Sequence, residues 1–388
     1  MESESLVFSV FLIFSGAAIL STFALFTRQP LIVSYIVLGG LLGPYGFDMI
    51  SDPHVLEQIG HIGIVFLLFL LGLDLQPRHF LQLLSKTAFI AVASAALLGL
   101  VGFGIGYGFG YNVTEALIIG VATTFSSTII GIKLLPTTVL HHKHTGEMVI
   151  AILLMQDILA IIVLMVLTGG SQNTSAGQWI MTFLALPGIL IFALGAVRWV
   201  ILPLLRRFDR FHEYIFLLAL GWCLGMAELA NHFQLSLEIG AFIAGVSLAN
   251  SPIAQYIATN LRPLRDFFLI MFFFTIGAGF NLGLLGSILL PSLLLAAAVI
   301  VLKPLVYHRL LRAVGEPNDL AWEVGIRLGQ TSEFSLLIAF IAFSMNFIGK
   351  EASHVIQATA IVTFLVSTYI IVFRYPSPIA ISDRLRRD

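Results

Sequence analysis

Apolar stretches of about 20 residues recur from one end of this 388-residue chain to the other. Each stretch is long enough to cross the hydrocarbon core of a bilayer as an α-helix. In that core the backbone polar groups must be paired within the segment, which favours helices. Hydrophobic residues make up 58% of the chain and charged residues only 11%, so a soluble fold is excluded. The sequence therefore predicts an all-α polytopic protein embedded in a lipid bilayer.

Charges, prolines and polar clusters divide the chain into about thirteen predicted transmembrane helices. Their ranges are 6–27, 30–47, 57–75, 85–110, 115–136, 145–169, 177–205, 211–232, 235–250, 263–281, 284–313, 320–344 and 353–374. When the loops are assigned alternately to the two sides, one side receives only Lys350 and the other side receives all the remaining basic loop residues. Basic loops stay in the cytoplasm, so we expect the amino terminus outside and the carboxyl terminus in the cytoplasm.

An internal repeat is found when the chain is compared with itself at an offset of 205 positions. Residues 6–169 then match residues 211–374, and residues 177–205 form a linker helix. Seven helices separate each span from its copy, and this odd number inverts the second copy. The coinciding pairs are Gly40 and Gly245, Phe69 and Phe274, Gly72 and Gly277, Gly120 and Gly325, Ser126 and Thr331, and Ser127 and Ser332. Such 6+6 inverted repeats are typical of secondary transporters, whose substrate site lies near the membrane midplane.

Polar clusters interrupt two helices that correspond in the repeat, at residues 123–128 and 328–333. A membrane helix can unwind at such a cluster because hydroxyls and amides satisfy the freed backbone groups. Two broken helices that cross at mid-depth would offer carbonyl oxygens to a dehydrated cation. The alternative is that these hydroxyls bond only to their own helices. We favour the functional interpretation because the two clusters occupy matching positions.

One acidic residue, Asp157, lies at the midpoint of the apolar segment 145–169. A carboxylate at that depth costs about 2.5–3.5 kcal/mol on insertion scales, which points to a functional role. Burial disfavours the ionised carboxylate, whereas a bound cation favours it. A proton and a cation would therefore compete for one negative charge, and exchange follows if the empty charged carrier cannot cross. Asp157 is thus the first candidate for a transport site.

Several segments resemble the bacterial monovalent cation:proton antiporter-2 family. They are residues 63–75 (GIVFLLFLLGLDL), 126–128 (SST), 145–147 (TGE), the pair Gln156 and Asp157, and residues 240–246 (GAFIAGV) and 329–334 (GQTSEF). The likeness covers nearly the whole chain. The Gln-Asp pair is most similar to the glutathione-gated potassium efflux antiporters, whereas sodium-type members carry Asp-Asp or Asn-Asp there.

The resemblance implies a homodimer in the bacterial cytoplasmic (inner) membrane, with a mobile core that moves in an elevator-like step relative to a dimerisation part. By analogy, residues 85–169 and 284–374 form that core within a single transmembrane transport domain.

We expect electroneutral potassium/proton exchange. Sodium/proton exchange on the same fold is the alternative, and a cation channel or a non-transporting sensor is less favoured. The expected site residues are Asp157, Gln156, Thr124, Ser126, Ser127 and Thr128, with Gln330, Thr331, Ser332 and Glu333 on the second broken helix.

Three further side chains have open roles. Gln156 either ligates the cation through its amide oxygen or simply packs between helices. Lys303, which matches a lysine paired with the first acid of the motif in sodium-type relatives, has three possible roles. It pairs with Asp157, titrates itself, or extends toward the cytoplasm near His308. For Arg327 and Glu333 we favour structural ion pairing over direct coordination.

No enzyme motif is evident, and the predicted transported ions are potassium or sodium together with protons, with no cofactor in this chain. The formal net charge of −1 gives no indication of nucleic acid binding, and the single cysteine, Cys223, excludes an intramolecular disulfide. The chain stops after its last predicted helix without the cytoplasmic nucleotide-binding domain common in potassium efflux relatives. We therefore expect that regulation comes from a removed cytoplasmic domain or a separate subunit.

Overall fold

The computed structural model describes residues 6–50, 53–74, 84–135, 144–169, 187–208, 210–233, 237–249 and 253–377, together with Leu235 and Ser251. These residues are overwhelmingly helical. Seven of the described helices are long and apolar enough to cross a membrane, and four more are apolar but shorter. The chain is therefore a multi-pass membrane protein, as the apolar stretches predict.

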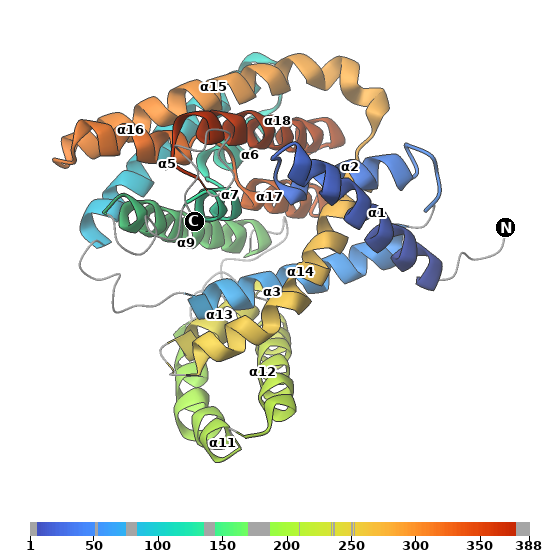
Figure 1. Ribbon diagram of the computed structural model, residues 1–388, viewed down its shortest axis with the longest axis vertical. Coiled ribbons are helices and arrows are strands. Elements are labelled where there is room, and N and C mark those ends of the chain that lie inside the picture. Colours follow the sequence, from blue (N-terminus) through green and yellow to red (C-terminus); the bar gives the residue numbers. More distant parts are fainter. Residues whose placement is uncertain are drawn as a thin grey trace. The chain divides into compact units, whose positions relative to one another are not determined.

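The chain divides into two compact units. The first comprises residues 1–4, 49–81 and 161–275. Its helices are α3 (Pro53–Asp74), the π-helical turn η1 (Val197–Ile201), α11 (Leu202–Arg207), α12 (His212–His232), α13 (Leu237–Ala249) and most of α14 (Ala254–Ala278). Within this unit α13 packs on α3 and α12, around a core of aliphatic and aromatic side chains (Figure 1).

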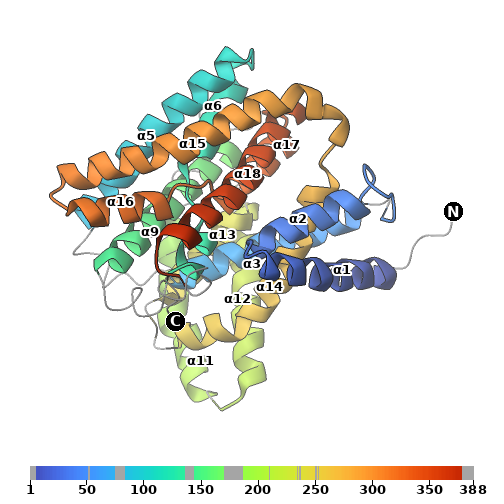
Figure 2. The ribbon, with the colours of Figure 1, turned by 45° about the horizontal axis from the view of Figure 1, so that its top comes forward.

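The second unit comprises residues 5–48, 82–160 and 276–388. Its helices are α1 (Leu6–Phe26), α2 (Leu31–Leu42), α5 (Leu84–Gly108), α6 (Val113–Thr124), α7 (Thr128–Lys133), most of α9 (His144–Gly169), the 3₁₀ turn η2 (Leu282–Leu284), α15 (Leu285–Ala313), α16 (Asn318–Arg327), α17 (Glu333–Ser344) and α18 (Lys350–Arg374). The long helix α15 packs against α5, α16 and α18 (Figure 2). Every residue of the candidate site lies in this unit.

Both predicted interruptions are present as breaks in helices. The first lies at residues 125–127, between α6 and α7, and the second at residues 328–332, between α16 and α17. A helix can start again after the second break because two serine hydroxyls cap it. The Ser332 hydroxyl accepts a hydrogen bond from the Phe334 backbone N–H (3.1 Å), and the Ser335 hydroxyl accepts one from the Ser332 backbone N–H (3.2 Å). This reciprocal capping pairs backbone donors that would otherwise be buried without partners.

The predicted helix 263–281 is wrong at its start, because α14 begins nine residues earlier, at Ala254. Arg262 and Pro263 suggested a boundary, yet Pro263 lies inside the helix. Neighbouring residues in a packed helix can compensate for the hydrogen bond that a proline removes. For the predicted linker helix 177–205, residues 187–207 are helical, and residues 177–186 lie outside the described part of the chain.

Glycines bring the helices of the second unit into close contact at positions related by the 205-residue offset. A Cβ atom at Gly120 of α6 would overlap the carbonyl oxygen of Gly99 on α5. At the corresponding positions, a Cβ atom at Gly325 of α16 would lie 2.7 Å from the carbonyl oxygen of Pro304 on α15. The helix that precedes each break is thus packed in the same way on its neighbour.

We expect Gly120→Ala to lower the thermal stability of the purified protein, because an added methyl group in a tightly packed interface costs about 1–3 kcal/mol. The matched control is Gly104→Ala on α5, where a Cβ atom would meet nothing within 4 Å. Thermal unfolding in detergent compares the two variants. Equal unfolding temperatures for both would contradict the close approach of α5 and α6.

Candidate functional site

The two broken helices are joined directly to each other. The Ser126 hydroxyl in the first break donates to the Leu328 carbonyl in the second (2.9 Å). The Ser335 hydroxyl at the start of α17 donates to the Ala122 carbonyl near the end of α6 (2.5 Å). Since each bond satisfies a carbonyl that unwinding has freed, the breaks stabilise one another.

Lys303 of α15 binds to both breaks at once. Its ammonium group donates to the carbonyl oxygens of Phe125 (2.6 Å) and Gln330 (2.8 Å), with a longer contact to Thr123 (3.3 Å). Phe125 and Gln330 correspond to each other at the 205-residue offset, so the ammonium bridges equivalent atoms of the two repeat segments. The side chain is fully buried, which does not fit extension toward the cytoplasm, one of its three possible roles.

Pairing of Lys303 with Asp157, the first of the three possible roles, is likewise not seen, because no ion pair within 4.0 Å joins these two described residues. The physical reason is that the ammonium donates three hydrogen bonds to backbone carbonyls. An ammonium group has three hydrogens to donate, and these acceptors match that number.

Gln156 supports the first break. Its amide oxygen accepts from the Ser126 backbone N–H (3.0 Å), and its amide nitrogen donates to the Thr124 carbonyl (3.3 Å) and to the Tyr307 hydroxyl. The side chain is 1% exposed. Both ends of the amide therefore hold the unwound backbone in place, which is more specific than helix packing and does not require cation ligation.

Asp157 lies beside Gln156 on α9 and is 2% exposed. Both of its carboxylate oxygens lie 3.4 Å from the Thr128 hydroxyl, at the first residue of α7. The carboxylate also interacts electrostatically with Glu333, the first residue of α17. Asp157 thus lies beside the start of α7, and Glu333 is itself the first residue of α17; helix N-terminal partial charges favour anions at such positions.

The remaining predicted residues divide by what their side chains contact. The Thr124 hydroxyl bonds back to Val121 (2.8 Å), and Ser127 caps α7 by accepting from the Ile130 amide (3.1 Å). In the second break, Gln330 accepts from Ser367 (2.8 Å) and Thr331 bonds to Thr363 (2.8 Å) on α18. These four side chains hold the backbone of the breaks in place. The side-chain oxygen atoms of Asp157 and Thr128, by contrast, lie next to one another.

Arg327 forms an ion pair with Glu323, at 2.9 Å. The guanidinium also donates to the carbonyls of Leu134 (3.0 Å) and Pro376 (2.9 Å). It therefore anchors the end of α16 to the segments that follow α7 and α18. Spacing explains the partner, because residues four apart lie on one helix face.

Sequence reasoning missed Tyr307, which is fully buried and bonds to Gln156. The feature that could have identified Tyr307 in the sequence is its position four residues after Lys303, which places both side chains on the same face of α15. It also missed Ser335, Thr363 and Ser367, whose hydroxyls act on the breaks. Serine and threonine are common in membrane helices, so their spacing alone did not single them out.

Comparisons with known proteins agree with this architecture. A family described as "Sodium/hydrogen exchanger, transmembrane" matches residues 10–374. The fold is similar to that of a sodium proton antiporter, NhaP1 from Methanocaldococcus jannaschii, with a TM-score of 0.71 and 17% sequence identity. The structural alignment covers 94% of this chain and 95% of the antiporter. At that identity the likeness concerns the fold.

Curated relatives include the iron transporter MagA of Paramagnetospirillum magneticum, which is 28% identical over 88% of this chain and 79% of the relative. The glutathione-regulated potassium-efflux protein KefC of an Enterobacter species is 28% identical over 96% of this chain, and that of Cronobacter sakazakii is 29% identical over 90%. The chain spans 60% and 57% of these two KefC proteins, respectively.

We expect Lys303→Met to destabilise the protein by about 2 kcal/mol or more, because it removes the donor for buried carbonyls in both breaks. The control is Lys350→Met, which removes an exposed ammonium at the start of α18. Denaturant unfolding of the two purified variants gives the comparison. A Lys303→Met protein as stable as Lys350→Met would show that the bridge adds nothing to the fold.

Proposed function

Because the chain belongs to the sodium/hydrogen exchanger family, we propose that it is a secondary active antiporter that exchanges a monovalent cation for protons at Asp157. The observation that carries this proposal is the buried carboxylate beside two broken helices. A carboxylate at such a place is costly, so its presence there points to a functional role. Potassium is the favoured cation, since the KefC relatives are named for potassium efflux.

The exchange itself rests on one site with two alternative ligands. In the proton-loaded form the carboxyl of Asp157 is neutral, and in the cation-loaded form the metal ion neutralises it. Thr128 supplies a hydroxyl oxygen next to the carboxylate. Gln156 positions the site by holding the backbone at Ser126 and Thr124. Both loaded forms can cross the membrane as neutral units, whereas the empty carboxylate cannot.

Lys303 serves as a fixed structural link in this scheme. Its bonds to Phe125 and Gln330 hold the broken helices together whether a proton or a cation occupies Asp157. The alternative, in which Lys303 moves to Asp157 when the cation leaves, requires those carbonyl bonds to break in every cycle. We favour the fixed role because three buried acceptors compete for the ammonium.

Alternating access by an elevator-like movement of residues 85–169 and 284–374 completes the proposal. These ranges lie within the second compact unit apart from residues 161–169. The inverted repeat of thirteen spans is supported by equivalent glycine contacts, at Gly120 and Gly325 within the second unit. We further propose a homodimer in the cytoplasmic membrane with the carboxyl terminus inside, controlled by a cytoplasmic domain or subunit.

We expect Asp157→Asn to abolish cation-driven proton movement, because an amide can carry neither a proton nor a countercharge for the cation. Proteoliposomes with an internal pH dye measure the response to added potassium, sodium and other alkali cations. The control is Asp319→Asn, which changes an exposed aspartate in the first turn of α16. Exchange that persists in Asp157→Asn would refute the site, while a preference for sodium would refute only the potassium assignment.

Electroneutral exchange gives a second expectation, since Asp157 carries either one proton or one monovalent cation per crossing. The exchange rate should not change when a voltage of about 100 mV is imposed on the liposomes. One net charge moved through that voltage would contribute about 2.3 kcal/mol to the step. A strong dependence of the rate on voltage would therefore show that another group, such as Glu333, also carries a proton.

A further inference from the structure

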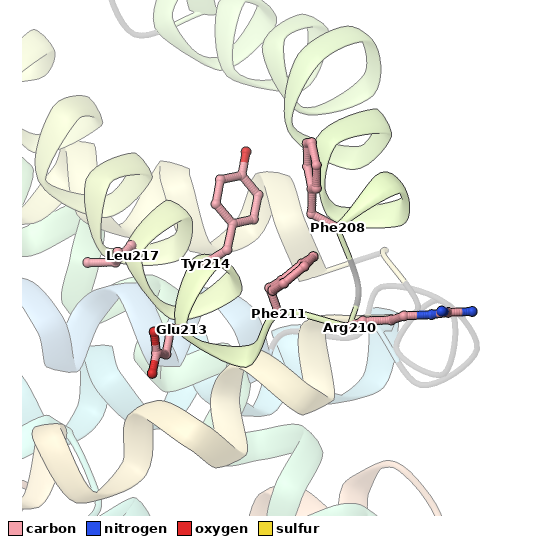
Figure 3. Close-up of a pocket in the computed structure, with 6 residues that line it drawn as sticks. All are labelled: Phe208, Arg210, Phe211, Glu213, Tyr214 and Leu217. Atoms are coloured by element: carbon pink, nitrogen blue, oxygen red, sulfur yellow. The ribbon is translucent and has the colours of Figure 1, made fainter.

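A groove in the first unit is lined by none of the residues of the transport site. It has a volume of about 590 Å³ and is lined by Phe208, Arg210, Phe211, Glu213, Tyr214 and Leu217, where the chain turns from α11 into α12. Figure 3 shows the rings of Phe208, Phe211 and Tyr214 grouped at the turn, while the Arg210 and Glu213 side chains extend away from them on opposite sides. An aromatic recess thus opens beside a cationic rim.

The rings hold a defined arrangement. Phe208 and Tyr214 meet edge to face with their centroids 5.2 Å apart, and the Arg207 guanidinium lies 5.9 Å from the Phe208 centroid. The Phe211 side chain, which precedes α12, remains 63% exposed. Tyrosine and tryptophan rings, here Tyr214, are enriched at the boundary between hydrocarbon and headgroups, where their apolar bodies meet a polar layer.

Three exposed arginines occur within five positions of the chain at this turn, Arg206, Arg207 and Arg210. Arg210 lines the recess, and Arg207 lies over the Phe208 ring. Acidic residues Asp209 and Glu213 also occur in this stretch. Glu213 also lines the groove, and Figure 3 shows its carboxylate on the side opposite Arg210. Among the described residues, none of the three guanidinium groups forms an ion pair within 4.0 Å.

The apolar surface next to the turn indicates at which level of the membrane the groove lies. Trp199 in η1 and Leu217 in α12 are 77% and 63% exposed, respectively. Trp199 precedes Arg206 by seven residues, which corresponds to a rise of about 10 Å along a helix. The turn therefore combines an exposed apolar base with a cationic tip. The distribution of basic loop residues predicts that this tip faces the cytoplasm.

We propose that the turn between α11 and α12 binds an anionic phospholipid of the cytoplasmic leaflet. The lipid phosphate binds to Arg206, Arg207 and Arg210, and the upper acyl chain covers Phe208, Phe211 and Leu217. Anionic lipids of this leaflet attract basic segments next to the membrane. The aromatic recess adds apolar contact that a soluble phosphate would not use.

The test compares phosphatidylglycerol with phosphatidylcholine of the same acyl chains, titrated into the delipidated full chain and followed by native mass spectrometry. Wild-type protein should bind phosphatidylglycerol at least tenfold more tightly, since each arginine near the surface contributes about fivefold. The triple variant Arg206→Gln, Arg207→Gln, Arg210→Gln should lose that preference. Equal binding of both lipids by the wild type, or an unchanged preference in the triple variant, would overturn the proposal.

Two further variants separate the groove from general attraction to charge. Arg309→Gln removes an exposed arginine near the end of α15 and should leave the preference intact. Phe211→Ala keeps all arginines and should weaken binding of phosphatidylglycerol severalfold. If Arg309→Gln weakened binding as much as the triple variant, or Phe211→Ala had no effect, the lipid would not occupy this groove. Size-exclusion profiles that match the wild type establish that each variant is folded.

Discussion

The bond between one buried ammonium group and two unwound helices is the interaction on which the second unit depends. Helices that stop in the middle of a membrane leave carbonyl groups without partners, and each such group is costly there. Lys303 supplies donors to Phe125 and Gln330 together, and Ser126 and Ser335 add direct bonds between the two segments. The breaks are therefore mutually supporting.

This arrangement explains why the acidic residue next to the breaks remains available. Gln156, one position earlier, is fully engaged in holding the first break, and Lys303 is occupied by carbonyls. Asp157 is left with the Thr128 hydroxyl at 3.4 Å and the electrostatic influence of Glu333. A carboxylate that is buried but not locked in an ion pair with a lysine can exchange its counter-ion. That freedom is what the proposed competition between proton and cation requires.

The sequence predicted the periodic and compositional features well and the tertiary contacts poorly. Helix ranges followed from apolar length, and both breaks followed from polar clusters at residues 123–128 and 328–333. The family resemblance is confirmed by the match over residues 10–374. The partners of Lys303 were not predictable, because they are backbone carbonyls and every residue has one. Tyr307 was missed for a similar reason, since its hydrogen bond to Gln156 joins helices that are far apart in sequence. The roles of the predicted site residues in transport stay predictions.

The most direct test of the central claim is the pH dependence of the apparent KM for the transported cation in proteoliposomes. If a proton and the cation compete for Asp157, the apparent KM should rise by about tenfold for each unit of pH below the titration midpoint of the site. The maximal rate at saturating cation should stay constant over the same range. An apparent KM that is independent of pH, with a maximal rate that falls instead, would contradict a single shared site.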